Sequence, residues 1–144
     1  MKNDERSGNS DELYEKMVHL QKIEVEIPIR TVSEANSSEH WTKKHARKKQ
    51  QRKICTFYLK STSRVSEKIE LPCLITLTRI SPRFLDTGDN LPCSFKHMRD
   101  VIAELITGDT RPGLADSDDR LTWEYKQEKG KPKQYGIRIT FEFA

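Results

Sequence analysis

The sequence has few of the residues that cross-link or anchor small proteins. Its 144 residues include only three cysteines, Cys55, Cys73 and Cys93, and no C-x-x-C pair. They are too few and too widely spaced for a disulfide framework, so we expect reduced thiols and a cytoplasmic protein. No apolar run approaches the ~20 residues that cross a bilayer, which excludes a membrane-spanning protein. Residues 1–12 lack the apolar core of a signal peptide, so we expect no secretion.

Several kinds of chemistry also lack their motifs. The chain has neither a glycine-rich phosphate loop nor a dinucleotide fingerprint, so no nucleotide cofactor is expected. His40 and His45 are five residues apart, which does not place two ligands on one helical face and disfavours zinc. Cys93 and Ser94 have no histidine base positioned in the local sequence, so nucleophilic catalysis is not predicted.

The small net charge conceals a separation of charge along the chain. The 26 Lys and Arg exceed the 22 Asp and Glu by only four. However, residues 41–53 contain seven basic residues and no acidic one, whereas residues 86–119 contain eight acidic residues against three basic ones. The length suits a single domain, which we place at residues 22–144 after a flexible polar tail at 1–21.

Alternating apolar residues predict that the fold begins with a strand at residues 22–30. The apolar positions are Ile23, Val25, Ile27 and Ile29. Pro28 offers no N–H to a ladder, so it places the end of this strand at an edge or terminus. A stretch without Gly or Pro then predicts a helix over residues 38–60, which Ser37 or Ser38 can cap.

The clearest helical pattern lies at residues 91–106. Its apolar stripe consists of Leu91, Phe95, Met98, Ile102, Leu105 and Ile106. Spacings of three and four residues place these side chains on one face of a helix. Asn90 stands where an N-cap belongs, and Gly108 follows the last apolar residue.

The remaining apolar segments predict three further strands. They lie at residues 71–80, 121–125 and 135–143, and the last two are joined by a Gly- and Pro-containing segment at 128–133 that indicates a hairpin loop. The predicted order is β-α-β-α-β-β. This order is typical of an α+β domain with a mixed sheet packed by two main helices.

Two acidic clusters occur in predicted loops at strand ends. The first contains Asp86, Asp89 and Asn90, and the second contains Asp116, Asp118 and Asp119. Carboxylates from separate loops can converge on Mg²⁺, which activates water and stabilises charge on a phosphate. Alternatively, these residues are ordinary turn and cap residues. The two clusters in a chain with a basic helix leave the interpretations about equally supported.

The basic stretch predicts contact with phosphates. Its candidate DNA-binding residues are Lys43, Lys44, Arg47, Lys48, Lys49 and Arg52. Neighbouring cations without anions repel one another, and a polyanion relieves that repulsion. A solvated helix face is the alternative. On the second helix, Lys96 and Asp100 are four residues apart and can pair on the polar side, while Lys96 is close enough to Asp89 to neighbour a bound phosphate.

Several of these residues form an order typical of a known family. The motifs are Leu85-Asp86-Thr87-Gly88-Asp89-Asn90-Leu91, Lys96-x-x-x-Asp100, Asp116-Ser117-Asp118-Asp119 and Trp123-x-Tyr125. With them the chain resembles the RusA family of Holliday junction resolvases, and most closely its phage and prophage branch. Residues 33–36, His40-Trp41 and the basic helix are similar to the N-terminal part of that branch. The resemblance covers residues 22–143.

The resemblance implies a RusA-like fold and a homodimeric, Mg²⁺-dependent endonuclease that cuts four-way DNA junctions by symmetric paired incisions. It implies a role in recombination and repair, with Mn²⁺ as a possible substitute metal, in a phage- or prophage-encoded protein of a bacterial host. The implied metal ligands are Asp86, Asp89, Asp116 and Asp118, with Asp119 ranked behind. Lys96 would steady the transition-state charge, while Asn90 and Asp100 would support the site.

Two spacings depart from the family pattern. Asp86 and Asp89 are separated by one residue more than the family's Asp-x-Asp-Asn, and Lys96 follows Asp89 by seven residues rather than four. A RusA-like protein that binds branched DNA without cutting it is therefore the alternative function. An RNA-binding or phage accessory domain is a third hypothesis.

Overall fold

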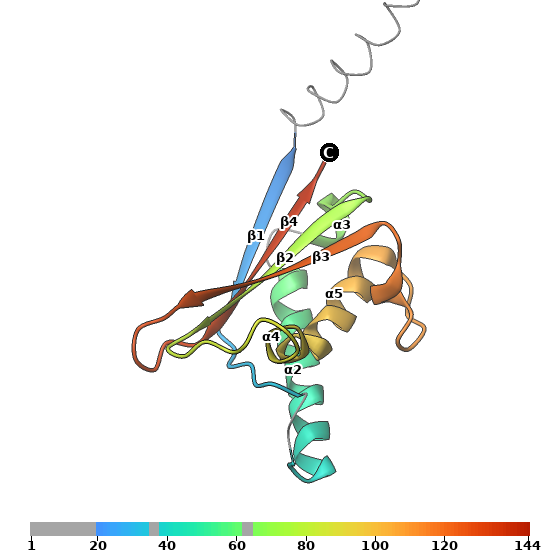
Figure 1. Ribbon diagram of the computed structural model, residues 1–144. Coiled ribbons are helices and arrows are strands. Elements are labelled where there is room, and N and C mark those ends of the chain that lie inside the picture. Colours follow the sequence, from blue (N-terminus) through green and yellow to red (C-terminus); the bar gives the residue numbers. More distant parts are fainter. Residues whose placement is uncertain (1–19, 35–37, 62–64) are drawn as a thin grey trace, which may run out of the picture.

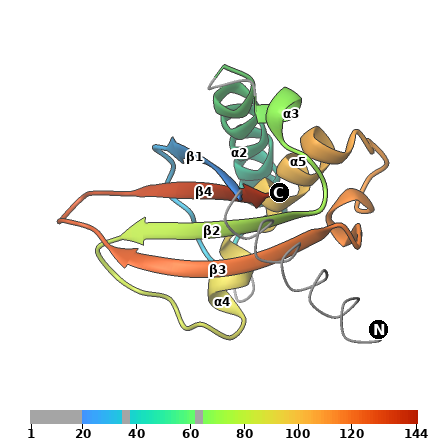
Figure 2. The same cartoon turned by 90° about the horizontal axis from the view of Figure 1, so that it is seen from above.

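The computed structural model describes residues 20–34, 38–61 and 65–144. Four strands form one sheet: β1 (Gln21–Ile27), β2 (Cys73–Ser81), β3 (Leu121–Lys129) and β4 (Gly136–Phe143). Their order across the sheet is β1-β4-β2-β3, which Figure 2 shows from above. The predicted strands are thus confirmed, with β1 beginning at Gln21. Residues 1–19 of the predicted tail, and residues 35 and 36 of the motif at residues 33–36, lie outside the described residues.

The sheet is mixed, as predicted, but the predicted hairpin is wrong. β4 pairs antiparallel with both β1 and β2, whereas β3 pairs parallel with β2. Because β2 lies between β3 and β4, the segment after β3 crosses the end of β2, where Gly130 N donates to Ser81 O over 3.0 Å. Turn residues alone do not distinguish a hairpin from this wider connection. A Cβ on Gly130 would lie 2.8 Å from Gln134 O, so the close approach requires glycine there.

The helices connect the strands and pack on one side of the sheet (Figure 1). They are α2 (Trp41–Ser61), α3 (Val65–Lys68), α4 (Asn90–Ser94), α5 (Lys96–Thr107) and the 3-10 helix Ala115–Ser117. The fold is therefore α+β with a four-stranded mixed sheet. Among the described residues, no helix is both long and apolar enough to cross a membrane.

Alternate residues of each strand face the helices and form the core. On the two central strands these are Ile75 and Leu77 of β2 and Ile139 and Phe141 of β4, all fully buried. On β3 the inward residues Leu121, Trp123 and Tyr125 alternate with exposed polar ones. That alternation is typical of an edge strand that buries one face.

The predicted helix at residues 91–106 is interrupted at Phe95. Ser94 Oγ donates to the Leu91 carbonyl over 2.7 Å, and Phe95 N turns to the carbonyl of Pro92 instead. A hydroxyl that competes for a helical carbonyl in this way weakens the ladder. The apolar stripe nevertheless stays continuous, because Phe95, Met98 and Ile102 are fully buried. Gly108 ends α5 with φ of 76°, as predicted.

The predicted caps of both helices need correction. Asn90 is the first residue of α4 and not its cap; its backbone and side-chain N–H groups donate to Asp86 Oδ1 over 3.3 and 2.6 Å. α2 begins at Trp41, and His40 precedes it, with its Nδ1 accepting from the Thr42 backbone. Ser38 therefore lies too early to cap α2, and Ser37 is outside the described residues.

The buried thiols are unreactive. All three cysteines are free. Burial raises the pKa of Cys55 to about 12 and that of Cys73 to about 11. Both side chains therefore remain protonated at neutral pH and act as core residues.

Candidate functional site

A cavity of about 410 Å³ opens where α4 and α5 meet β3 and the 3-10 helix. Its lining residues are Pro92, Cys93, Lys96, Arg99, Asp100, Gly113, Asp116 and Tyr125. The break at Phe95 lets both short helices contribute to it. Three of the residues selected from the sequence, Lys96, Asp100 and Asp116, thus meet around one space.

Asp100 is the least satisfied carboxylate of this cavity. It is half-buried and has no hydrogen bond or ion pair with any residue that the structure describes. Burial raises its pKa above the usual value, and the negative charge of Asp116 raises it further. The two carboxylates repel each other across the cavity, and a bound cation would neutralise their charges.

Two contacts hold Asp116 in place, one with Trp123 and one with Arg99. Its carbonyl accepts from Trp123 Nε1 over 3.2 Å, and its Oδ2 lies 3.4 Å from Arg99 Nε, which is longer than a hydrogen bond. Arg99 is fixed in turn by a contact with the Tyr125 hydroxyl and by the Trp123 ring, whose centroid lies 4.8 Å from the guanidinium carbon. The Trp123-x-Tyr125 motif therefore positions Arg99 beside Asp116.

Lys96 connects this cavity with a second one. The second cavity, of about 360 Å³, lies along the first half of α2 and is lined by Glu34, Trp41, Lys44, His45, Lys48, Lys96 and His97. Lys96 itself is exposed and has no hydrogen bond or ion pair within the described part of the chain. Its ammonium is available to a ligand that extends from one cavity to the other.

Asp86 and Asp89 do not line the first cavity. Both are exposed, and Asp86 supports the start of α4 through Asn90 and through its carbonyl, which accepts from Leu91 N over 3.0 Å. Asp89 lies one helical turn before Cys93, a lining residue, so it stands at the edge of the site. Asn90 also accepts from Ser33, which ties the segment before α2 to α4.

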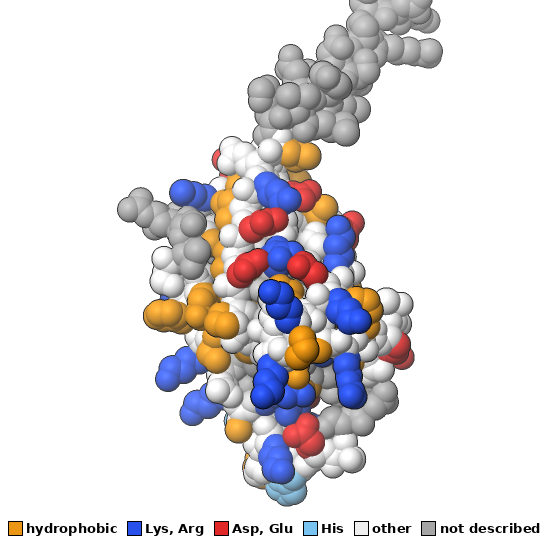
Figure 3. Space-filling view, turned by 90° about the vertical axis from the view of Figure 1, so that its left-hand side faces the viewer, with side chains coloured by type: hydrophobic (Ala, Val, Ile, Leu, Met, Phe, Trp, Pro, Cys, Tyr) orange, Lys and Arg blue, Asp and Glu red, His pale blue; other side chains and the backbone are white. Residues whose placement is uncertain are grey.

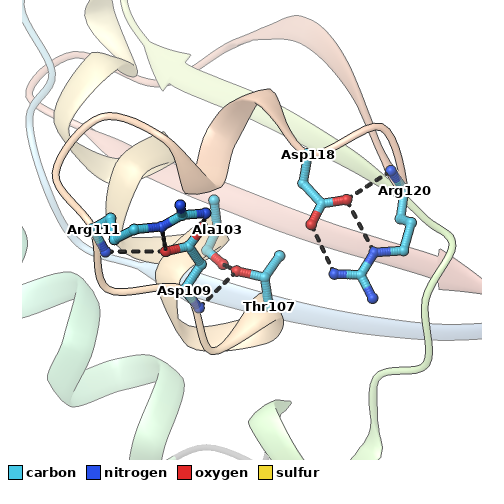
Figure 4. A network of polar contacts seen from close by, with 6 residues as sticks. All are labelled: Ala103, Thr107, Asp109, Arg111, Asp118 and Arg120. Atoms are coloured by element: carbon cyan, nitrogen blue, oxygen red, sulfur yellow. Dashed lines mark hydrogen bonds and ion pairs between the residues drawn. The ribbon is translucent and has the colours of Figure 1, made fainter.

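Asp118 is engaged elsewhere. Both of its carboxylate oxygens bind Arg120, with Oδ2 2.7 Å from Nη2 and Oδ1 accepting from the backbone N over 2.9 Å. Asp109 binds Arg111 in the same way (Figure 4). These hydrogen bonds lower the pKa of both carboxyl groups to about 2. Asp119 is exposed and lies outside the cavity lining.

The basic residues in the first half of α2 fall into two groups, exposed lysines and ion-paired arginines. Lys43, Lys48 and Lys49 are exposed, whereas Arg47 binds Glu34 through two hydrogen bonds of 2.8 and 2.9 Å and also binds Glu39. Arg52 binds Glu104 over 2.8 Å. The two arginines therefore hold α2 against the rest of the fold. Figure 3 shows Lys and Arg side chains along the length of one face of the molecule.

Arg79 was not identified from the sequence, although it breaks the apolar pattern of β2. It follows Cys73, Ile75 and Leu77 on the inward face and is only 8% exposed. Its Nε donates to Thr31 Oγ1 over 3.1 Å and its Nη1 to the Arg83 carbonyl over 2.7 Å. Arg79 therefore holds together the two segments that lead from β1 toward α2 and from β2 toward α4.

The donor set fits a hydrated divalent cation rather than a fully protein-coordinated one. Over residues 20–34, 38–61 and 65–144, no three His, Cys, Asp or Glu side chains gather as metal ligands. Asp100 and Asp116 still supply two carboxylates to one open space. Mg²⁺ commonly binds one or two carboxylates, keeps several waters and takes further oxygens from a substrate phosphate.

Comparisons with known proteins add no family to this description. The sequence matches no protein-family model and no curated protein.

Proposed function

We propose that the protein is a Mg²⁺-dependent endonuclease that cuts branched DNA at four-way junctions, as the RusA resemblance implies. The observation that carries the proposal is the convergence of Asp100, Asp116 and Lys96 on one cavity beside a basic helix. Two mutually repelling carboxylates suit a cation, and an unpaired ammonium suits a phosphate. These are the charges that phosphodiester hydrolysis requires.

Each residue has a role that follows from its surroundings. Asp100 and Asp116 would hold Mg²⁺, with Asp89 at the edge of the site. The bound metal would supply activation of water and neutralisation of phosphate charge. Lys96 would bind a phosphate oxygen, and Arg99 keeps Asp116 oriented toward the cavity through its contacts with Trp123 and Tyr125. Lys48 and Lys49 would contact phosphates of the junction arms.

A homodimer is part of the proposal. Two symmetric cuts require two sites related by a two-fold axis, and each chain contributes one such cavity. The dimer is expected to form in solution without DNA, and sedimentation or light scattering would measure it.

Binding of branched DNA without cleavage is the second candidate function. It is favoured by the pairing of Asp116 with Arg99 and by the position of Asp86 and Asp89 outside the cavity lining. A site with only two carboxylates and one of them paired would bind a divalent cation weakly.

One experiment separates the two functions. The protein is incubated with a labelled synthetic four-way junction or a linear duplex, with Mg²⁺, with Mn²⁺ or with chelator. Paired nicks at symmetric positions of the junction, present only with the metal, are the expected result. Tight junction binding without cleavage under either metal would replace the endonuclease by the binding protein. Equal cleavage of the linear duplex would contradict structure selectivity.

A further inference from the structure

The second cavity contains an exposed aromatic ring surrounded by cations. Trp41 is 70% exposed at the start of α2. It lies with Lys44, His45 and Lys48 on one helical face, because these residues are spaced three, one and three positions apart. Lys96 of α5 also lines this cavity. A large apolar ring is thus presented to solvent within a basic rim.

The acidic residue of this cavity does not cancel the basic rim. Glu34 is bound by Arg47, and this hydrogen-bonded pair lowers the pKa of Glu34. Its charge is therefore already neutralised by a residue that faces the interior. His97 is buried, and burial lowers its pKa, so it is neutral at pH 7. Two lysines of the cavity, Lys48 and Lys96, form no ion pair with any residue that the structure describes.

This combination matches nucleic acid better than a protein partner. Protein interfaces are depleted in lysine, whereas single-stranded nucleic acid is bound by aromatic platforms within positively charged grooves. The ring of His40, whose centroid is 5.8 Å from that of Trp41 with a 34° tilt, extends the aromatic surface. A base is the planar apolar group that fits such a surface, and its flanking phosphates fit the lysines.

We propose that Trp41 stacks on an exposed face of a DNA base while Lys48 and Lys96 contact the adjacent phosphates. Because Lys96 lines both cavities, a strand held in this way continues toward Asp100 and Asp116. The faces of bases inside a duplex are covered by stacking on their neighbours, whereas a branch point interrupts this stacking and uncovers the faces of the central base pairs. The stacking therefore accounts for selection of branched DNA, and this last step rests on the proposed endonuclease function.

Fluorescence of Trp41 tests the stacking directly. The chain has two tryptophans, so Trp123→Phe leaves Trp41 as the only indole reporter. The variant is titrated in chelator with single-stranded DNA, a four-way junction, a duplex with one unpaired base and a hairpin whose loop is a non-nucleotide linker, so that it contains no unpaired base. Strong quenching by the first three and little quenching by the hairpin are expected. Equal quenching by the hairpin, or none by any DNA, would overturn the proposal, as would quenching by anionic lipid vesicles alone.

Binding by variants of the otherwise unchanged chain gives a second measurement. Trp41→Ala should weaken binding to the junction about tenfold, and Trp41→Phe should retain most of the affinity. Phe57 provides a matched control, because it is a 65% exposed aromatic on the same helix; Phe57→Ala should leave binding unchanged. Equal losses in the Trp41→Ala and Phe57→Ala variants would contradict a specific role for Trp41.

The salt dependence separates stacking from charge. Trp41→Ala should leave the slope of log affinity against log salt unchanged, since stacking releases no counterions, whereas Lys48→Ala should reduce it by about one. In one outcome, DNA quenches the fluorescence and the Trp41→Ala variant loses affinity, yet the protein cuts no DNA. That result would refute the endonuclease function but support the stacking site. If the Trp41→Ala variant cuts the junction as fast as the unmodified protein, the endonuclease function would be supported and the stacking site refuted.

Discussion

Asp116 and Asp118 are two residues apart in one connection and each lies beside an arginine, yet only Asp118 is hydrogen-bonded to its arginine through both carboxylate oxygens. Asp118 is bound on both oxygens by Arg120, and its pKa falls to about 2 (Figure 4). Asp116 lies 3.4 Å from Arg99 Nε, farther than a hydrogen bond, and it faces a cavity with Asp100, whose pKa is raised by burial and by the negative charge of Asp116. A carboxylate that a neighbouring arginine satisfies has a structural use. One that is held against another carboxylate is suited to a cation.

The same difference occurs between neighbouring cations of α2. Arg47 extends the inward stripe of Gln51, Cys55 and Leu59 and binds two glutamates. Lys48, one residue later, is exposed at the second cavity. Charged residues that are adjacent in sequence thus divide between holding the fold and facing a ligand.

The largest effect is expected from Asp116→Asn. Loss of a cation-binding charge from the cavity should reduce Mg²⁺-dependent junction cleavage by on the order of 100-fold or more while junction binding persists. Asp118→Asn is the matched control and should cut at a rate close to that of the unmodified protein. Cleavage rates and mobility shifts on the same junction measure both. A cleavage defect that is larger for Asp118→Asn would invert the assignment.

A smaller effect is expected when the exposed lysines of α2 reverse their charge. Lys48→Glu with Lys49→Glu should weaken junction binding roughly tenfold or more and lower the salt slope by about two. Lys131→Glu with Lys133→Glu changes the same charge in the exposed β3–β4 connection and should have little effect. Titrations at several salt concentrations provide the measurement. An unchanged slope would show that α2 is not the phosphate contact.

Asp100→Asn should stabilise the fold slightly at neutral pH. The raised pKa of Asp100 means that the native state prefers the protonated form, so ionisation destabilises the fold above this pKa. The gain should be roughly 1–3 °C in melting temperature, because solvent screens the charge, and it should vanish as the pH falls below the usual value of 3.8. Thermal melts between pH 3 and 8 measure it. A loss of stability at pH 7 would contradict a raised pKa of Asp100.

The smallest effect is expected from removing the two arginine-bound carboxylates together. Asp109 and Asp118 have pKa values lowered from 3.8 to about 2, so their contribution is present above about pH 4 and is lost as the pH falls toward 2. Asp109→Asn with Asp118→Asn should therefore lose less stability in that acid range than the unmodified protein. Acid titration followed by circular dichroism compares them. Identical acid transitions would mean that these pairs contribute nothing.

Local patterns were sufficient for the elements and insufficient for their arrangement. Period-two alternation predicted β1, β3 and β4, and an apolar segment at residues 71–80 predicted β2. The hairpin prediction failed because pairing of β2 with β3 is a long-range contact that Gly130 and Pro132 do not encode. The helix at residues 91–106 was predicted with the right inward face, but the Ser94 hydroxyl that interrupts it competes for a carbonyl in a way that periodicity does not detect.

The candidate site was predictable as a set of charges but not as a geometry. Asp116 and Lys96 were selected from the sequence, and Asp100 was assigned only a supporting role. The sequence could not show that Arg120 pairs with Asp118 or that Arg47 pairs with two glutamates. Those pairings depend on loop conformation and on residues far apart along the chain. The candidate role of Trp41 could not be predicted either, because it depends on the exposure of the side chain, which only the structure gives.

Divalent-metal binding by the unmodified chain and by matched variants tests the central claim most directly. Electron paramagnetic resonance during a Mn²⁺ titration reports the bound ion without any need for catalysis. We expect Mn²⁺ binding that is lost in Asp100→Asn and in Asp116→Asn and is retained in Asp109→Asn and in Asp118→Asn. Unchanged binding in Asp116→Asn, or loss of binding in Asp118→Asn, would contradict the assignment of the cavity carboxylates as the cation site.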